Sequence, residues 1–302
     1  MNNVITLIAD HKQKNLDETI INKVFILLEK AKCQVENIKW LCPEIACDVF
    51  FIGKIDDKAR EKLDVLSEKF KIDFIVQSNS PSRKKKLLIS DMDSTIINEE
   101  CIDEIADKLG LKDKVSKITE RAMNGELDFK DALRERVALL KGLSEEKLLE
   151  VYENNISLMS GAKELVQTMR KNGAYCLLVS GGFTFFTQKI AKEVGFEENH
   201  ANILEIKNGV LTGTVAEPIL DKESKLASLK ETVKKLGIAD SDVLASGDGA
   251  NDLPMIKAAG LGVAYHAKPN VKKEAQAKVD YADLRALLYA QGYTEQEIVN
   301  GR

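Results

Sequence analysis

The stretch LLISDMDST, residues 87–95, decides how the rest of the chain is interpreted. Its apolar start, Leu87–Ser90, has the pattern of a short buried strand, and Asp91 and Asp93 follow at once. In an open parallel sheet, ligand sites lie beyond the carboxyl ends of the strands. A carboxylate pair there can bind a hard divalent cation, or one carboxylate can attack while the other transfers protons. Alone, the pattern fits an acidic loop or helix cap equally well.

Two further polar clusters follow apolar runs. In SGG, residues 180–182, a hydroxyl and unhindered backbone amides stand before a helical pattern, a combination that can bind an anion. In GDGAND, residues 247–252, the glycines allow a tight bend, and Asp248 with Asp252 could complete a set of oxygen ligands for magnesium. An aspartate that caps the next helix is the simpler interpretation, and both can hold. We expect all three clusters to converge at one edge of a sheet.

The periodicity of apolar residues along the sequence divides the chain into two units. Residues 1–80 follow the order βαββαβ, and SNSPS at 78–82 interrupts the periodicity as a linker. In residues 86–302, short apolar strands alternate with helices, which indicates a parallel sheet covered on both faces. Residues 97–160 are helical in period and predict an inserted cap, and Asn208-Gly209 predicts a hairpin. The expected core strands are Leu87–Ser90, Tyr175–Val179, Val243–Ser246 and Gly262–His266.

Composition excludes several classes of protein. The 302 residues are 44% hydrophobic and 30% charged, as in an ordinary globular protein, and the net charge of −4 disfavours a nucleic-acid binder. The five cysteines and three histidines are scattered, which disfavours a zinc site and a disulfide framework. Because neither a signal peptide nor a membrane-spanning run is recognisable, we expect a cytoplasmic protein without a membrane partner.

Taken together, these motifs resemble the ordered signature of the haloacid dehalogenase (HAD) superfamily. The wider context of residues 91–141 is similar to the phosphoserine phosphatase family within it, and the resemblance runs from about residue 87 to about residue 270. It implies an α/β fold, a HAD-like Rossmannoid parallel sheet with an inserted helical cap. It also implies Mg²⁺-dependent hydrolysis of O-phospho-L-serine through an aspartyl-phosphate, the last step of serine biosynthesis. The matching segments are DMDST at 91–95, SGGF at 180–183, Lys225 and GDGAND at 247–252.

The same resemblance implies a role for each matching residue. Asp91 corresponds to the nucleophile, and Asp93 to the acid that protonates the leaving serine oxygen and then deprotonates the attacking water. Magnesium would be held by Asp91, the Asp93 carbonyl, Asp248 and Asp252. The remaining matches would bind substrate: Ser180, Gly181, Lys225 and Asn251 at the phosphoryl group, Glu100 and Arg136 at the ammonium and carboxylate, and Met123 and Phe129 beside them.

The N-terminal βαββαβ order resembles an ACT-like domain, a fold often used to bind amino acids and to pair subunits. Fold does not fix function, so a structural role and a homodimerising role both remain open. Two other functions also stay open for the whole chain. One is a phosphatase or phosphotransferase for another small phosphorylated metabolite, because Glu100 and Arg136 cannot choose water over another acceptor. The other is an amino-acid-sensing regulatory protein, which is disfavoured because the chain keeps Asp91, Asp93, Lys225, Asp248 and Asp252.

Overall fold

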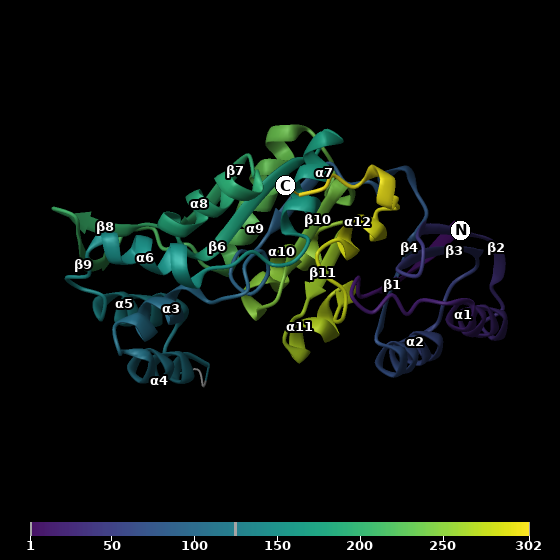
Figure 1. The fold of residues 1–302 in the computed structure, drawn as a ribbon, viewed down its shortest axis with the longest axis horizontal. Helices are drawn as coiled ribbons and strands as arrows, with labels where there is room; N and C mark the ends of the chain where they lie inside the picture. The colour runs from purple at the N-terminus through teal and green to yellow at the C-terminus, as the bar shows by residue number, and fades with distance from the viewer. Residues whose placement is uncertain (1, 124–125, 302) are drawn as a thin grey trace.

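The computed structural model describes residues 2–123 and 126–301. Three groups of elements follow one another along the long axis (Figure 1). A small N-terminal sheet lies at one end, a larger sheet lies in the middle, and a group of short helices lies at the other end. The central sheet and its two neighbours therefore form a row, with the helical group furthest from the N-terminus.

The N-terminal sheet is antiparallel, with strand order β2-β3-β1-β4. Each of its two helices begins after an aspartate whose side chain accepts a backbone N–H of the first turn, from Ile20 to Asp17 and from Ala59 to Asp56. The expected βαββαβ order is confirmed. The elements are β1 (Asn2–Ala9), α1 (Glu18–Lys30), β2 (Gln34–Cys42), β3 (Ala46–Ile52), α2 (Asp57–Phe70) and β4 (Ile72–Ser78).

The central sheet of the described residues is parallel, with order β12-β11-β10-β5-β6-β7. The strand that precedes Asp91 therefore lies between β10, which leads into residues 247–252, and β6, which contains residues 180–182 instead of ending at Val179 as expected. The parallel α/β sheet expected from the sequence is confirmed, whereas β7 and β12 were not expected. The strands are β5 (Leu87–Ser90), β6 (Tyr175–Phe183), β7 (Glu198–Asn202), β10 (Val243–Gly247), β11 (Leu261–Tyr265) and β12 (Ala277–Val279).

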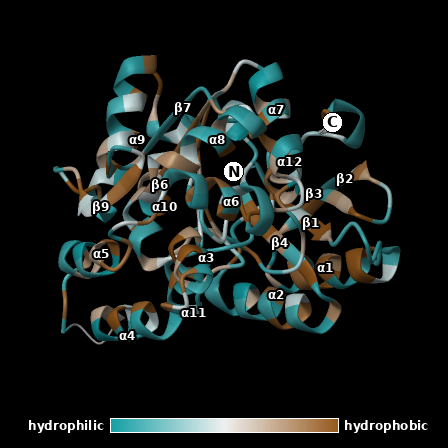
Figure 2. Ribbon diagram, turned by 60° about the vertical axis from the view of Figure 1, so that its left-hand side comes forward, coloured by the Kyte–Doolittle hydropathy of each residue, from teal (hydrophilic) through white to brown (hydrophobic). Residues whose placement is uncertain are grey.

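Helices cover both faces of this sheet because successive side chains of a strand point to opposite faces. Leu88 belongs to the core under α7, α8 and α12, whereas Leu87 and Ile89 belong to the core under α9, α10 and α11. Figure 2 shows the helices banded in hydrophobic and hydrophilic colours, as expected for helices with one buried face. None of the described helices is long and apolar enough to cross a membrane. The bounds are α7 (Ala162–Lys171), α8 (Thr184–Val194), α9 (Lys222–Leu236), α10 (Leu253–Ala258), α11 (Pro269–Glu274) and α12 (Ala286–Ala290), with 3-10 turns at Pro81–Arg83, Asp240–Asp242, Ala250–Asp252 and Glu295–Glu297.

The inserted helices are joined to the sheet by two adjacent chain segments. Ile97 pairs with Leu158 in an antiparallel bridge, and the Glu99 carboxylate accepts both the backbone N–H and the hydroxyl of Ser157, at 2.8 and 2.6 Å. A hairpin of β8 (Leu204–Lys207) and β9 (Val210–Val215) also packs on the helices, with Val210 bridging to Ser144. The helices are α3 (Cys101–Lys108), α4 (Lys112–Met123), α5 (Phe129–Ala138) and α6 (Glu145–Asn155).

A buried arginine joins the N-terminal sheet to the C-terminal part of the chain. Arg83 donates to both carboxylate oxygens of Asp48, at 2.8 and 2.7 Å, and to the Ala290 carbonyl at 3.0 Å. Nearby, β4 packs beside β12, so the outermost strand of one sheet lies against the outermost strand of the other. Asp73 in β4 accepts backbone N–H groups from Asp280 and Ala282, at 2.7 and 2.9 Å.

Candidate active site

Asp91 lies at the carboxyl end of β5, where neighbouring strands hold the chain. Its backbone N–H donates to the Ser246 carbonyl of β10 at 3.0 Å, and the residue is 5% exposed. The Oδ1 atom accepts the Met92 backbone N–H at 2.8 Å and lies 2.7 Å from Lys225 Nζ. Because both of these side-chain interactions use Oδ1, they fix the carboxylate while Oδ2 is left for other chemistry.

Lys225 supplies a buried positive charge behind the pocket. It lies in the first turn of α9, whose N-cap Asp221 accepts the Ser224 backbone N–H. Its ammonium group lies 2.7 Å from Asp91 and 2.6 Å from Asp252. Burial alone would lower the pKa of Lys225, but the two carboxylates together raise it, so the ammonium stays charged.

Three carboxylates form a cluster that suits a hard cation. Oxygen atoms of Asp91, Asp248 and Asp252 all lie within 4.8 Å of one another. Burial and then the Asp252 charge raise the pKa of Asp248 to about 6, a sign of uncompensated negative charge. A Cβ at Gly247 would overlap the Asp252 carboxyl group, so glycine there admits this carboxylate. The set is all oxygen, as Mg²⁺ and Ca²⁺ prefer, and therefore fits such an ion.

Asp93 connects the β5 loop to β6 and to the inserted helices. Its Oδ1 accepts the Cys101 backbone N–H at 2.8 Å, and its Oδ2 accepts the Ser180 hydroxyl at 3.0 Å. The Ser180 oxygen in turn accepts the Gly182 backbone N–H at 2.8 Å. Burial raises the pKa of Asp93 above its ordinary value. A carboxyl group in this state can carry a proton nearer neutral pH and give it to a leaving group.

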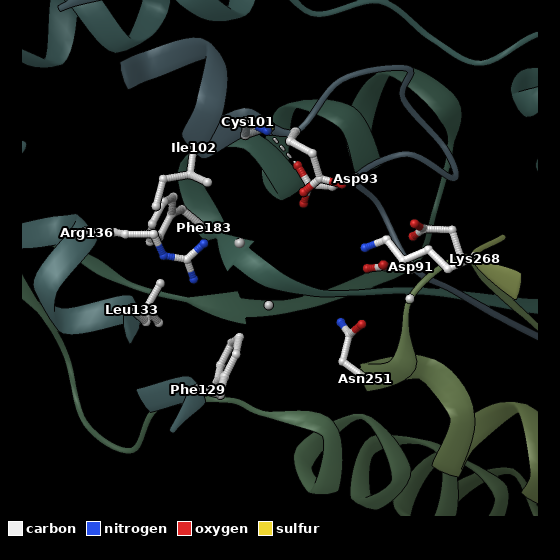
Figure 3. A pocket seen from close by; sticks show the side chains of 15 residues that line it. Asp91, Asp93, Cys101, Ile102, Phe129, Leu133, Arg136, Phe183, Asn251 and Lys268 are labelled. Atoms are coloured by element: carbon white, nitrogen blue, oxygen red, sulfur yellow. Dashed lines mark hydrogen bonds between the residues drawn. The ribbon is translucent and has the colours of Figure 1, made fainter. Parts of the chain in front are cut away.

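A cavity of about 140 Å³ lies between these strand ends and the inserted helices. Figure 3 shows Arg136 on one side of it and Asp91 on the other. Arg136 Nε donates to the Ala132 carbonyl at 3.2 Å. Within residues 2–123 and 126–301, no carboxylate lies within 4 Å of its guanidinium group, although it is half-buried. An arginine in this position is suited to bind an anion from outside the chain.

Glu100 lines the same cavity. Its Oε1 accepts the Ser94 hydroxyl at 2.7 Å. Burial and then the Asp93 charge raise the pKa of Glu100 to about 7, so a cation in the cavity would stabilise its charged form. The cavity therefore presents a carboxylate, and a guanidinium group with no carboxylate partner among the described residues, to whatever occupies it.

The structure brings nearly all of the expected site residues together. Phe129, Gly181 and Asn251 line the cavity, and Ser180, Lys225 and Asp252 lie directly behind its wall, bonded to residues that line it. Met123 ends α4, and its side chain falls outside the described residues.

One lining residue with a side-chain charge, Lys268, was missed by the sequence analysis. It follows β11, and its backbone N–H donates to the Asp248 carbonyl at 3.1 Å. Its charge lowers the pKa of both Asp248 and Glu100, against the larger effect of burial. The signal was available, because Lys268 stands just beyond the carboxyl end of another parallel strand.

Comparison with known proteins identifies the family. The model of haloacid dehalogenase-like hydrolases matches residues 88–257. The chain belongs to this family. This HAD hydrolase is 50% identical to a phosphoserine phosphatase of Polaromonas sp. over 208 residues. The aligned region covers 67% of this chain and 88% of the relative. The crystal structure of a probable phosphoserine phosphatase from Vibrio cholerae has a TM-score of 0.79 at 31% identity, covering 99% of this chain and 90% of that one. A phosphoserine phosphatase solved as a phospho-aspartyl intermediate analogue has a TM-score of 0.63 at 41% identity and covers 68% and 98% of the two chains.

Proposed function

We propose that this HAD hydrolase is a Mg²⁺-dependent phosphoserine phosphatase, which hydrolyses O-phospho-L-serine to L-serine and phosphate in the last step of serine biosynthesis. The observation that carries the proposal is the arrangement of one small cavity. A fixed carboxylate, Asp91, lies on one side and the guanidinium group of Arg136 on the other, and Glu100 lines the same cavity. A phosphorylated amino acid has the matching groups, because its phosphate, ammonium and carboxylate need a nucleophile, an anion and a cation.

The chemical step uses two carboxyl groups of the chain. Asp91 attacks phosphorus and forms an aspartyl-phosphate, while the proton on Asp93 passes to the departing serine oxygen. Asp93, now a carboxylate, takes a proton from the water that attacks the aspartyl-phosphate. Hydrolysis releases phosphate and restores both groups. The hydrogen bonds of Asp93 to Cys101 and Ser180 support this role because they fix its carboxyl group beside Asp91.

The cation site of the proposal consists of Asp91, the Asp93 backbone carbonyl, Asp248 and Asp252. The cluster of carboxylate oxygens and the raised pKa of Asp248 support it. When bound, Mg²⁺ would supply positive charge to the phosphoryl oxygens. The Ser180 hydroxyl, the Gly181 backbone N–H and Asn251 would orient the phosphoryl group, and Lys225 would offset negative charge from behind Asp91.

Phosphate release from a panel of esters tests the function. The panel holds L-phosphoserine, phosphothreonine and a sugar phosphate, each with Mg²⁺ and with EDTA. We expect strong preference for phosphoserine, loss of turnover in EDTA and recovery on adding Mg²⁺. Turnover that persists in EDTA would contradict the metal requirement. Equal rates on all esters would favour a different small phosphorylated metabolite, and transfer of phosphate to an added alcohol would favour a phosphotransferase.

We further propose that residues 1–80 form an ACT-like domain, and that residues 86–302 form the HAD domain with its cap at about residues 97–160. The four-stranded antiparallel sheet with two helices supports the first unit. A homodimer that pairs two N-terminal domains, and a cytoplasmic location, complete the proposal. Analytical ultracentrifugation of the full chain tests the dimer, and a sedimentation coefficient of a monomer at micromolar concentration would exclude it.

A further inference from the structure

Ser94 has a backbone conformation that is unusual for a serine. Its φ of +53° lies in the left-handed region, which costs free energy for any residue with a side chain. The loop holds this conformation with a hydrogen bond from the Ser94 backbone N–H to the Glu99 carbonyl at 3.2 Å. Glycine at position 94 would adopt the same turn without the strain. The retained side chain therefore suggests a use for the hydroxyl group.

The hydroxyl of Ser94 is engaged with one particular atom. It donates to Glu100 Oε1 at 2.7 Å, within the range of a strong hydrogen bond to a carboxylate. Ser94 stands in the loop that follows β5, and Glu100 stands at the start of α3, the first inserted helix. This bond therefore connects the loop of the nucleophile to the element that covers the cavity.

Glu100 does not use its side chain in the way usual for its position. It is the N-cap residue of α3, where a side-chain oxygen commonly accepts a backbone N–H of the first turn. In the described structure of α3 it makes no such capping bond. Instead, its carboxylate lines the cavity and is held there by Ser94. The helix thus forgoes a stabilising cap, and the carboxylate faces the cavity.

We propose that Ser94 is the positioning residue for recognition of the substrate's ammonium group. Its hydroxyl occupies Oε1 of Glu100 and fixes the plane of the carboxylate, so that Oε2 is presented to an ammonium in the cavity. Ser94 thereby makes the enzyme select phosphate esters that carry an amine beside the ester over esters that lack one. This inference rests on the proposed phosphoserine phosphatase activity and deepens it.

The variant Ser94→Gly separates this role from folding. It keeps the left-handed turn, relieves the strain and removes the hydroxyl, so its thermal midpoint should equal or exceed that of the wild type. Lys32→Gly is the matched control, because Lys32 has a similar φ of +57° in an exposed turn of the N-terminal unit. Ser94→Ala removes the same hydroxyl but keeps the strain, so both position-94 variants should change selectivity alike.

Initial rates on two substrates give the readout: phosphoserine, and 3-phosphooxypropanoate, which is phosphoserine without its amine. We expect Ser94→Gly to lower kcat/KM for phosphoserine about tenfold, mainly through KM, as for loss of one hydrogen bond to a charged group. The rate on 3-phosphooxypropanoate and both rates of Lys32→Gly should not change.

The outcomes separate this inference from the proposed function. A wild type that prefers phosphoserine, with a Ser94→Gly variant that keeps that preference, overturns only the role of Ser94. An equal loss on both substrates also overturns it, because the hydroxyl would then serve the phosphoryl end. A wild type that turns over both esters alike overturns the amine selectivity together with the proposed function.

Discussion

The ring of Phe129 lies against the backbone of Gly181, so closely that a Cβ at position 181 would come 3.3 Å from the ring edge. Phe129 opens α5 of the inserted helices, and Gly181 lies in β6 of the sheet. Both residues line the cavity. The absence of a side chain at position 181 thus lets the inserted helices approach the strand ends.

Gly181→Ala should therefore disturb closure over the site. We expect kcat/KM for phosphoserine to fall about tenfold, since a small displacement of positioned groups is costly in catalysis. Combining it with Phe129→Leu should recover part of the loss, because the smaller side chain makes room for the new methyl group. Steady-state kinetics of the single and double variants test this. A loss that Phe129→Leu leaves unchanged would mean that the methyl group acts on the phosphoryl site instead.

Asp91→Asn should abolish turnover while the protein stays folded. The amide cannot form the acyl-phosphate, so we expect kcat to fall by more than about a thousandfold, as for loss of other nucleophiles. The thermal midpoint should change by only a few degrees, because asparagine can still accept from Met92 and Lys225. Phosphate release and circular dichroism measure the two properties. Turnover near that of the wild type would refute Asp91 as the nucleophile.

Arg136→Ala should impair recognition of the substrate carboxylate. A charge-assisted contact to a half-buried guanidinium is worth about 2–3 kcal/mol, so we expect kcat/KM for phosphoserine to fall about 30- to 150-fold. Phosphoethanolamine, which lacks the carboxylate, should show little change. Arg134→Ala is the matched control, because Arg134 lies two residues away and pairs at the surface with Asp131 and Glu217. Similar losses on both substrates would assign Arg136 to helix stability.

Arg83→Met should destabilise the fold without touching the cavity. Removing one partner of a buried ion pair leaves the Asp48 carboxylate uncompensated, and such changes cost about 3–5 kcal/mol. Lys84→Met removes an exposed pair with Glu297 and should cost less than about 1 kcal/mol. Urea unfolding of the three proteins gives the comparison. Equal stability of Arg83→Met and the wild type would show that methionine packs as well as the ion pair.

Glu198 should make the free energy of unfolding decrease as the pH falls into the acidic range. Hydrogen bonds from Tyr175, Lys235 and His200 lower the pKa of Glu198 to about 2, below the 4.5 of an unperturbed glutamate. Its charged form therefore stabilises the fold above pH 4.5, and the contribution is lost as pH falls towards 2. Because the side chain is 34% exposed, we expect Glu198→Gln to cost less than about 1 kcal/mol at pH 7.

Unfolding free energies of wild type and Glu198→Gln from pH 7 to pH 3 test this expectation. The two curves should converge as pH falls, whereas the exposed Glu146→Gln should follow the wild type throughout. A constant difference between Glu198→Gln and the wild type would show that the loss comes from packing instead of charge.

The parts of the fold with strong local signals were predictable from sequence. The strand Leu87–Ser90 and the helix Lys222–Leu236 agree with the structure because their apolar periods are clear. Strand β7 was missed because its sequence, ENHAN, is polar, and its pairing with β6 alone makes it a strand. The short β12 was missed for a related reason, since three residues carry no period.

The site was predictable where residues follow strands or match a family motif, and less so where tertiary contacts decide. Asp91, Ser180 and Asp248 were found because parallel strands end at one edge. The pairing of Ser94 with Glu100 goes with the left-handed conformation of Ser94 itself, which no local pattern indicates. Likewise, the β8–β9 hairpin was expected from Asn208-Gly209, but its packing on the inserted helices depends on the assembled fold.

The packing of β4 beside β12 has a consequence for the solubility of the separate parts of the chain. Each strand is the last of its sheet, and the contacts between them are made by side chains: Asp73 of β4 accepts backbone N–H groups just after β12, and Lys278 of β12 pairs with Asp64 of α2. Unpaired strand edges recruit strands from other molecules and lead to aggregation. Separation of the N-terminal sheet from the central sheet would therefore leave both edge strands, β4 and β12, without their neighbour. We therefore expect either part of the chain, when it is expressed alone, to be less soluble than the full chain.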